Sequence, residues 1–207
     1  MREAINNLEL ILPLLNFKEE GDFYHLIIMV RKKDFTTERS NHQSVRTIKT
    51  YTIYSKEYLI EKYEEIKGLC EFFKARAYIS VNRLNNSDIS LKMIEKLVHS
   101  IQNGSKNVKG VYDSVVGSLP SKEKRWVIDL DADVLEKQNI IEEEINSLDP
   151  IGNKILAKIP TKSGLHLITS PFRSDLYELW CKENNINTDI QKLNPTILYL
   201  GKSLMNN

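Results

Sequence analysis

Cysteine is scarce in this sequence: the 207 residues include only Cys70 and Cys181. Two cysteines at this separation do not match the spacing of a metal cluster, and a disulfide scaffold would need more of them. We therefore expect a protein of a reducing compartment, the cytoplasm. Cys70 lies in a stretch typical of a helix, where a buried structural thiol is the expected role.

Long hydrophobic runs are also missing. No apolar stretch approaches the roughly 20 residues that a membrane-spanning helix needs, so we expect no membrane partner. The apolar segment near the N-terminus is interrupted by Glu9, and no small-residue cleavage site follows it. These features argue against a signal peptide and favour a short amphipathic helix.

A strong charge imbalance is the third absence. The 29 Lys and Arg residues against 28 Asp and Glu residues give a formal net charge of +1. Composition therefore gives no global sign of nucleic-acid binding, although a local basic groove could still provide it. Hydrophobic residues at 41% and charged residues at 28% are typical of a globular protein. There is no internal repeat and no low-complexity tract.

The first half of the chain is predicted to form a mixed α/β lobe. Apolar and β-branched runs indicate strands, and Ser55 is a good N-cap for a helix with apolar residues at helical spacing. The predicted elements are, in order, strand 23–31, polar loop 34–44, strand 45–54, helix 55–74, strand 75–82, helix 86–103 and a short helix at 108–117. The segment 117–124 is rich in Gly, Ser, Pro and charge, so we expect a junction there and an N-terminal lobe at residues 1–117.

The second half shows a clearer pattern of strands and helices. Its predicted elements are strand 125–130, helix 134–147, strands 154–160 and 165–171 joined by a hairpin turn, helix 174–183 and strand 196–200. This β-α-β-β-α-β order is the split β-α-β arrangement of ferredoxin-like and RNA-recognition-type folds. The sequence thus predicts an α+β protein with a split β-α-β lobe at residues 118–207, packed with the N-terminal lobe into one compact unit.

Two aspartates follow a short apolar run in Trp126-Val127-Ile128-Asp129-Leu130-Asp131. Residues two apart on a strand point to the same face, so the carboxylates of Asp129 and Asp131 should converge. Two ionised carboxylates side by side repel each other unless a cation lies between them, and a hard divalent cation with phosphate oxygens fits that need. The alternative is that both are solvated residues at a strand end.

A histidine follows the predicted hairpin turn in Thr161-Lys162-Ser163-Gly164-Leu165-His166. In the split β-α-β order, its strand pairs beside the strand of Asp129, so His166 could lie on the same face of the sheet. Lys162 and Ser163 offer an ammonium, a hydroxyl and backbone N–H groups, all suited to phosphate oxygens. The alternative is a hydrogen-bonded histidine of the core.

A later carboxylate, Asp189, precedes the last predicted strand. Three carboxylates around a histidine and a lysine are typical of a metal-assisted phosphoryl or nucleotidyl transfer site. The alternative for Asp189 is a local Asx-turn in a loop.

Together these residues resemble the archaeo-eukaryotic primase superfamily. Asp129-Leu130-Asp131 after an apolar strand, Ser163-Gly164-Leu165-His166 on a hairpin, and the later Asp189 follow the order of that family's three motifs: an Asp-x-Asp pair, a small-x-His motif and a last acidic residue. The resemblance is closest to the primase-polymerase domains and covers about residues 75 to 200.

The resemblance implies a metal-dependent nucleotidyltransferase that joins nucleoside triphosphates on a DNA or RNA template. Asp129, Asp131 and Asp189 would bind two Mg²⁺ or Mn²⁺ ions, with His166 completing the catalytic set. The residues implied in nucleotide binding are Ser163, His166, Lys162, Lys192, Asn82 and Arg83. A replication partner protein could also be required. The Asn-, Lys- and Ile-rich composition suits an AT-rich genome, and a small domain of this kind suits a phage or mobile element.

Basic residues around the first two predicted strands could hold the template. A basic strand-loop-strand segment with interleaved tyrosines suits phosphate contacts and base stacking. The candidate residues are Arg31, Lys32, Lys33, Arg46 and Lys49. The alternative is a solvated charged loop.

Two other functions fit parts of the pattern. A non-catalytic nucleic-acid-binding accessory protein of replication could share the same fold and surface. A sugar-nucleotide transferase also uses Asp-x-Asp to hold a metal, but it gives no account of the hairpin from Ser163 to His166.

Overall fold

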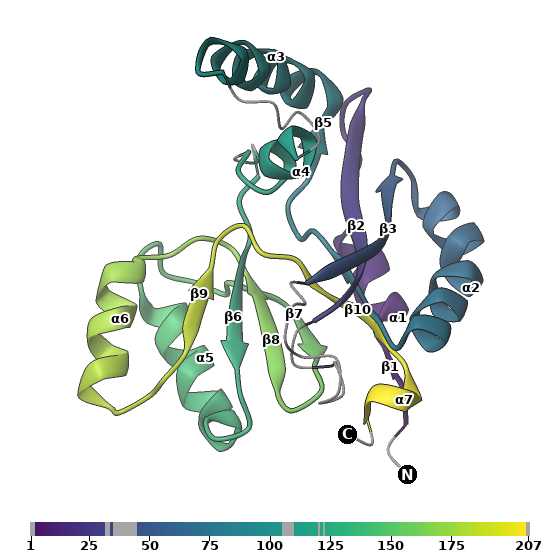
Figure 1. Ribbon diagram of the computed structural model, residues 1–207. Helices are drawn as coiled ribbons and strands as arrows, with labels where there is room; N and C mark the ends of the chain where they lie inside the picture. The colour runs from purple at the N-terminus through teal and green to yellow at the C-terminus, as the bar shows by residue number, and fades with distance from the viewer. Residues whose placement is uncertain are drawn as a thin grey trace.

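The fold is mixed α+β, and its strands form two antiparallel sheets that lie side by side (Figure 1). It is seen in a computed structural model that describes residues 3–31, 34, 45–104, 110–119, 121 and 123–205.

The larger sheet has the strand order β1-β10-β4-β2-β3, with β5 pairing with β2. Its strands are β1 (Ile5–Asn6), β2 (Asp22–Val30), β3 (Arg46–Ile53), β4 (Arg76–Ile79), β5 (Leu84–Asn85) and β10 (Thr196–Leu200). The smaller sheet has the order β7-β8-β6-β9 and consists of β6 (Trp126–Leu130), β7 (Ile155–Pro160), β8 (Leu165–Thr169) and β9 (Asp189–Gln191). Because β8 pairs antiparallel with both β6 and β7, those two strands run parallel to each other with β8 between them.

Helices cover the outer faces of the two sheets. In Figure 1, α5 (Gln138–Ser147) and α6 (Ser174–Glu183) lie beside the smaller sheet, and α2 (Lys56–Phe73) lies at the far side of the larger sheet. The remaining helices are α1 (Leu8–Ile11), the 3-10 helices η1 (Leu12–Leu14) and η4 (Leu135–Lys137), α3 (Asn86–Gln102), α4 (Val111–Val116) and α7 (Lys202–Met205). No helix among the described residues is long and apolar enough to cross a membrane.

The long helix α2 begins and ends as its sequence predicts. The Ser55 hydroxyl accepts a hydrogen bond of 3.0 Å from the Tyr58 N–H, which satisfies one of the free donors of the first turn. Leu59, Tyr63, Ile66 and Cys70 recur at helical spacing and are buried against the larger sheet. Lys74 adopts a left-handed conformation at the C-terminal end, with a φ of 50°.

The smaller sheet contributes to two hydrophobic cores, one on each face. Ile128 and Leu130 are fully buried with residues of α5 and α6, including Ile141 and Tyr177. Val127, which points to the opposite face, joins the core shared with the larger sheet. The same alternation turns the side chain of Asp129 toward the larger sheet.

The strand at residues 196–200 is confirmed, but its predicted place is wrong. It was expected to be the last strand of the β-α-β-β-α-β series, whereas β10 pairs with β1 and β4 in the larger sheet. The short β9 pairs with β6 instead. The segment 118–207 therefore contributes strands to both sheets.

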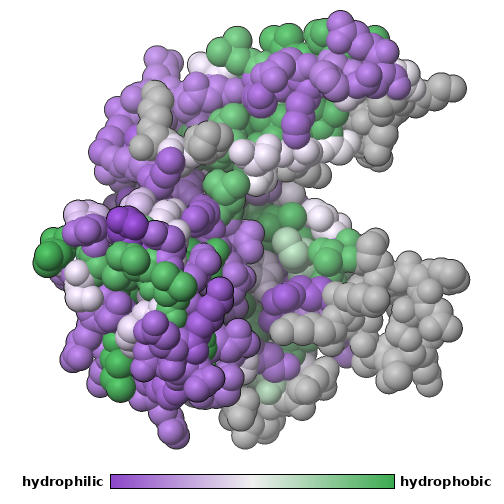
Figure 2. Space-filling view, turned by 90° about the vertical axis from the view of Figure 1, so that its left-hand side faces the viewer, coloured by the Kyte–Doolittle hydropathy of each residue, from purple (hydrophilic) through white to green (hydrophobic). Residues whose placement is uncertain are grey.

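Helices α3 and α4 form a small unit above the sheets with a core of its own around Phe23, Ile89 and Val115 (Figure 1). The molecule is hollowed between this unit and its lower part (Figure 2). A second apolar stripe of α3 is exposed, and it consists of Leu91, Ile94, Val98 and Ile101.

The side chain of Asn82 links the two sheets. Its Nδ2 donates to the carbonyls of Arg125, at 3.0 Å, and Lys192, at 3.1 Å, and its Oδ1 accepts from the N–H of Arg125 at 2.6 Å. Arg125 directly precedes β6 and Lys192 directly follows β9, while Asn82 follows β4. Both amide hydrogens of this buried side chain are thus used to hold the smaller sheet beside the larger one.

We predict that Asn82→Ala lowers the free energy of unfolding by about 2–3 kcal/mol, because it leaves several buried backbone groups without partners. The matched control is Asn103→Ala, an exposed asparagine at the end of α3, for which we expect a change below about 0.5 kcal/mol. Urea denaturation of the three proteins measures both values. Equal effects of the two substitutions would show that Asn82 does not have this linking role.

Candidate functional site

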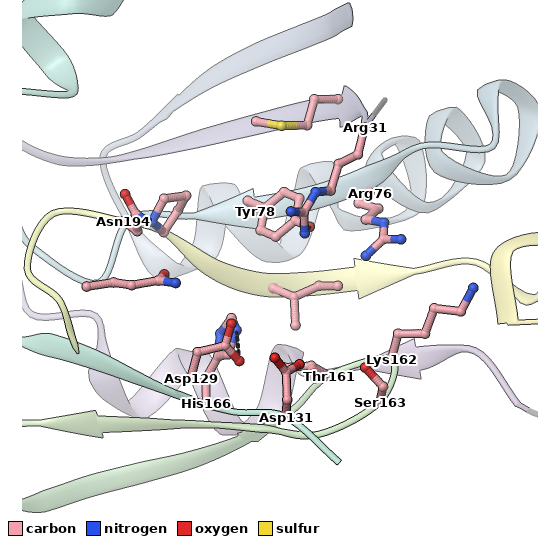
Figure 3. A pocket seen from close by; sticks show the side chains of 14 residues that line it. Arg31, Arg76, Tyr78, Asp129, Asp131, Thr161, Lys162, Ser163, His166 and Asn194 are labelled. Carbon is pink, nitrogen blue, oxygen red and sulfur yellow. Dashed lines mark hydrogen bonds and ion pairs between the residues drawn. The ribbon is translucent and has the colours of Figure 1, made fainter. Parts of the chain in front are cut away.

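A cleft of about 330 Å³ lies between the facing sides of the two sheets (Figure 3). It is lined by strands of both sheets and by the turn between β7 and β8. The lining residues are Met29, Arg31, Arg76, Tyr78, Asp129, Asp131, Thr161, Lys162, Ser163, His166, Gln191, Asn194, Pro195 and Ile197. Five of the residues predicted from separate motifs are therefore together here: Asp129, Asp131, Lys162, Ser163 and His166.

Strand register brings the first two motifs together on one wall. Asp129 of β6 lies directly opposite His166 of β8, so both side chains project from the same face. Asp131 follows the last residue of β6 and lines the same cleft. In Figure 3, the side chains of Asp129, His166, Asp131 and Ser163 all rise from this wall.

The turn between β7 and β8 depends on Gly164. A Cβ atom at this position would lie 1.9 Å from the carbonyl oxygen of Leu130 and 3.1 Å from the Cα of Asp131. Any larger residue would therefore push the turn away from the end of β6. Thr161 closes the turn: its N–H donates to the Gly164 carbonyl at 3.0 Å, and its hydroxyl accepts from the Gly164 N–H at 3.1 Å. This packing keeps Lys162 and Ser163 beside Asp131.

His166 is buried between the two sheets, with one edge toward the cleft. Its Nε2 lies 3.6 Å from Oδ1 of Asp129, and its Nδ1 lies 2.9 Å from the hydroxyl of Thr196 on β10. Burial lowers the pKa of the imidazole from 6.5 to about 4; Asp131 opposes this shift and Arg31 adds to it. At neutral pH the ring therefore carries no charge.

The opposite wall belongs to the larger sheet. Tyr78 of β4 lies between Ile27 of β2 and Ile197 of β10, and Tyr78 and Ile197 line the cleft. The Tyr78 hydroxyl accepts a hydrogen bond of 3.5 Å from Arg31. Arg31 is thus a predicted template-binding residue that reaches this site.

Arg76 provides a second cation on the same wall. Its guanidinium donates to both carboxylate oxygens of Asp34, at 2.8 and 2.5 Å, and both side chains are almost fully buried. This two-fold contact fixes the orientation of Arg76 before any ligand is present. Figure 3 shows Arg31 and Arg76 on the wall that faces Asp131 and Lys162.

Asp189 is close to the aspartate pair in the sheet but does not line the cleft. It lies opposite Asp129 on the edge strand β9, and its Oδ2 accepts a hydrogen bond of 3.1 Å from Gln191. Among the described residues, no group of three or more His, Cys, Asp or Glu side chains is placed to hold a metal ion. The arrangement therefore offers two carboxylates to a cation. This fits Mg²⁺, which is often bound by one or two carboxylates together with substrate phosphates.

Three residues predicted to bind nucleotide lie elsewhere. The Lys192 ammonium lies 4.9 Å from the ring centre of Trp126 and 3.3 Å from the Ser174 hydroxyl, on the helix-covered side of the smaller sheet. Asn82 uses its amide to join the sheets. Arg83 is buried in an ion pair of 3.1 Å with Asp22.

Two residues predicted to bind a template also face away from the cleft. Lys49 pairs with Glu65 of α2 at 2.5 Å, and the Arg46 guanidinium lies 6.0 Å from the ring centre of Phe73 at the end of α2. Both therefore lie on the α2 side of β3. Lys32 and Lys33 lie outside the described residues.

Sequence reasoning missed most of the wall formed by the larger sheet. Arg76 and Tyr78 lie two apart in a strand that was correctly predicted, and a single arginine in an otherwise apolar strand was the available signal. Gln191 is the last residue of β9 and Asn194 lies in the turn that follows it. Neither residue stood out from its neighbours in the sequence. Comparisons with protein-family models, with curated proteins and with solved structures found no match.

We predict that His166 makes the protein less stable as the pH falls from about 6.5 to about 4. The unfolded chain binds a proton on this residue near pH 6.5 and the folded chain only near pH 4, so protons favour the unfolded state between these values. Above about pH 6.5 the buried neutral ring causes no loss of stability. At pH 4 it lowers the free energy of unfolding by ~3 kcal/mol. Urea denaturation from pH 7.5 to 4, with a chelator present, measures it.

His166→Gln should remove this part of the pH dependence and leave the part that other groups cause. His99→Gln, at an exposed position on α3, is the matched control and should keep the full slope. Identical slopes for all three proteins would contradict the assignment to His166.

Proposed function

We propose that this chain is a primase-polymerase-like nucleotidyltransferase, which joins nucleoside triphosphates on a nucleic-acid template with Mg²⁺ or Mn²⁺. The observation that carries the proposal is the meeting of Asp129, Asp131, Ser163 and His166 in one cleft. These residues belong to two motifs that are more than 30 positions apart in the sequence, and they are two of the three motifs on which the resemblance to the archaeo-eukaryotic primase superfamily rests.

The strand order of the smaller sheet supports the same proposal. β6 and β7 run parallel with β8 between them, and α5 connects the first two strands. This is the connectivity expected of a split β-α-β lobe. With β9 as its fourth strand, the lobe presents Asp129 and His166 on neighbouring strands, which is the placement that the two motifs require.

The distribution of charge supports a ligand that combines a cation with phosphates. Asp129 and Asp131 provide anionic oxygens on one wall, and Arg31, Arg76 and Lys162 provide positive charge around the same space. A divalent ion would be held by the two aspartates. When bound, it would supply Lewis-acid activation and neutralise charge on the phosphates.

The side chains around the aspartates can each take one part in nucleotide binding. The Nε2 edge of His166 and the Ser163 hydroxyl face the cleft and could donate hydrogen bonds to phosphate oxygens. Lys162 and Arg31 would attract the triphosphate, and Tyr78 and Ile197 would contact its less polar parts. The neutral state of His166 at pH 7 suits a hydrogen-bond donor that is not itself an ion.

Metal binding is the first test. Isothermal titration with Mn²⁺ should show binding to the native protein, and the double variant Asp129→Asn, Asp131→Asn should lose it. The matched control is Asp133→Asn, which changes an exposed aspartate two residues further along that does not line the cleft. Binding that survives in the double variant, or is lost equally in the control, would contradict the proposed metal site.

Nucleotide joining is the second test. The native protein, incubated with labelled nucleoside triphosphates, Mn²⁺ or Mg²⁺ and a single-stranded template, with and without a primer, should give a template-dependent product. Asp129→Asn should lower the rate by about 10²-fold or more, because the metal contributes several kcal/mol of charge stabilisation. Asp133→Asn should retain the native rate.

A native protein that binds the template but gives no product under any of these conditions would contradict the catalytic proposal. It would favour a nucleic-acid-binding accessory protein with the same fold. Product formation that is equal in the native protein and in Asp129→Asn would place the chemistry outside this cleft.

A further inference from the structure

A single hydrogen bond joins His166 of the smaller sheet to Thr196 of the larger sheet. The Thr196 hydroxyl lies 2.9 Å from Nδ1 of His166, behind the cleft. Thr196 is 1% exposed and His166 is 8% exposed, so water does not compete for this contact. Thr196 is the first residue of β10, the strand that returns to the larger sheet, and it does not line the cleft itself.

This contact determines which edge of the imidazole faces the cleft. The ring has two nitrogens on different edges, and Thr196 occupies the one at Nδ1. Nε2 is then left toward Asp129, with 3.6 Å between Nε2 and the carboxylate oxygen Oδ1 (Figure 3). A ring turned by 180° about its Cβ–Cγ bond would place carbon atoms at both of these positions and lose both contacts.

The same two neighbours also determine which nitrogen carries the hydrogen. A carboxylate oxygen can only accept, so the contact with Asp129 is favourable when the hydrogen is on Nε2. Nδ1 then has a free lone pair, and a threonine hydroxyl can donate to it. The reverse tautomer would turn a lone pair of Nε2 toward an anionic oxygen.

We propose that Thr196 is a positioning residue: its hydroxyl donates a hydrogen bond to Nδ1 of His166 and thereby holds Nε2–H toward Asp129 and the cleft. The consequence for nucleotide joining rests on the proposed function, whereas the tautomer and the orientation of the ring do not. A donor that is fixed in this way meets a phosphate oxygen without a change in ring orientation at the moment of reaction.

The tautomer is measured by ¹⁵N NMR of the histidine ring nitrogens at neutral pH, with a chelator present. His166 of the native protein should show a protonated Nε2 and an unprotonated Nδ1, and the signals are assigned with His166→Gln. Thr196→Ser keeps the hydroxyl and should preserve this pattern. Thr196→Val removes the hydroxyl and should give a mixture of tautomers, because only Asp129 then favours a hydrogen on Nε2.

Two NMR results would overturn the proposal. One is a native His166 that carries its hydrogen on Nδ1, a result that needs no variant to fold. The other is a folded Thr196→Val protein with the native tautomer unchanged. Thr52→Val, a substitution of an exposed threonine on β3, is the matched control and should leave the His166 signals unchanged.

Nucleotide joining gives an independent readout. Thr196→Val should lower kcat/KM by about tenfold, the effect of one lost hydrogen bond in the transition state, and Thr196→Ser should restore most of the loss. A native rate in a Thr196→Val protein with an altered tautomer would contradict the positioning role in catalysis. If the native protein forms no product while the NMR pattern is as expected, the proposed function fails and the structural role of Thr196 stands.

Discussion

The alternation of side chains along β6 determines both the packing of the smaller sheet and the position of the cleft. Ile128 and Leu130 point into the core beneath α5 and α6, so Val127 and Asp129 must face the larger sheet. Because the period of a strand is two, a shift of one residue in register would bury the carboxylate among aliphatic side chains. Burial of each large aliphatic side chain contributes about 1.5–3 kcal/mol to the free energy of unfolding. The burial of Ile128 and Leu130 therefore also determines which face of the strand carries Asp129.

The cleft opens where the facing surfaces of the two sheets change from apolar to polar. Val127 and Ile168 belong to the shared core, and one step further along the strands the facing residues are Asp129 and His166. Complete desolvation of an ionised carboxylate costs far more than the contacts between the sheets could return. The sheets can therefore close over the aliphatic part of their facing surfaces, and they leave solvent access at the acidic part. The close approach of Gly164 to Leu130 then adds the turn with Lys162 and Ser163 as a further side of the cleft.

The sequence alone predicted the local elements well and the long-range ones less well. Helix α2 was predicted because Ser55 and the apolar spacing are local signals. The meeting of Asp129 and His166 was expected because the order of the elements predicted the pairing of their strands, and β6 does pair with β8. The exchange of β9 and β10 could not be predicted: β9 has three residues, too few to show alternation, and the choice of sheet depends on packing over the whole molecule. For Asn82 the family resemblance implied nucleotide binding, whereas here its side chain bonds to backbone groups of distant segments.

The cations around the cleft differ in how strongly they are already neutralised. Arg76 shares its charge with the buried carboxylate of Asp34, so its main contribution is a fixed surface with defined donors. Arg31 contacts the neutral hydroxyl of Tyr78, which leaves its charge largely available to an anion, and it belongs to the larger sheet. Lys162 belongs to the turn of the smaller sheet. An anionic ligand that neutralises both Arg31 and Lys162 must therefore contact both sheets at once, so a site that uses both cations lies between the sheets and not on the surface of either one.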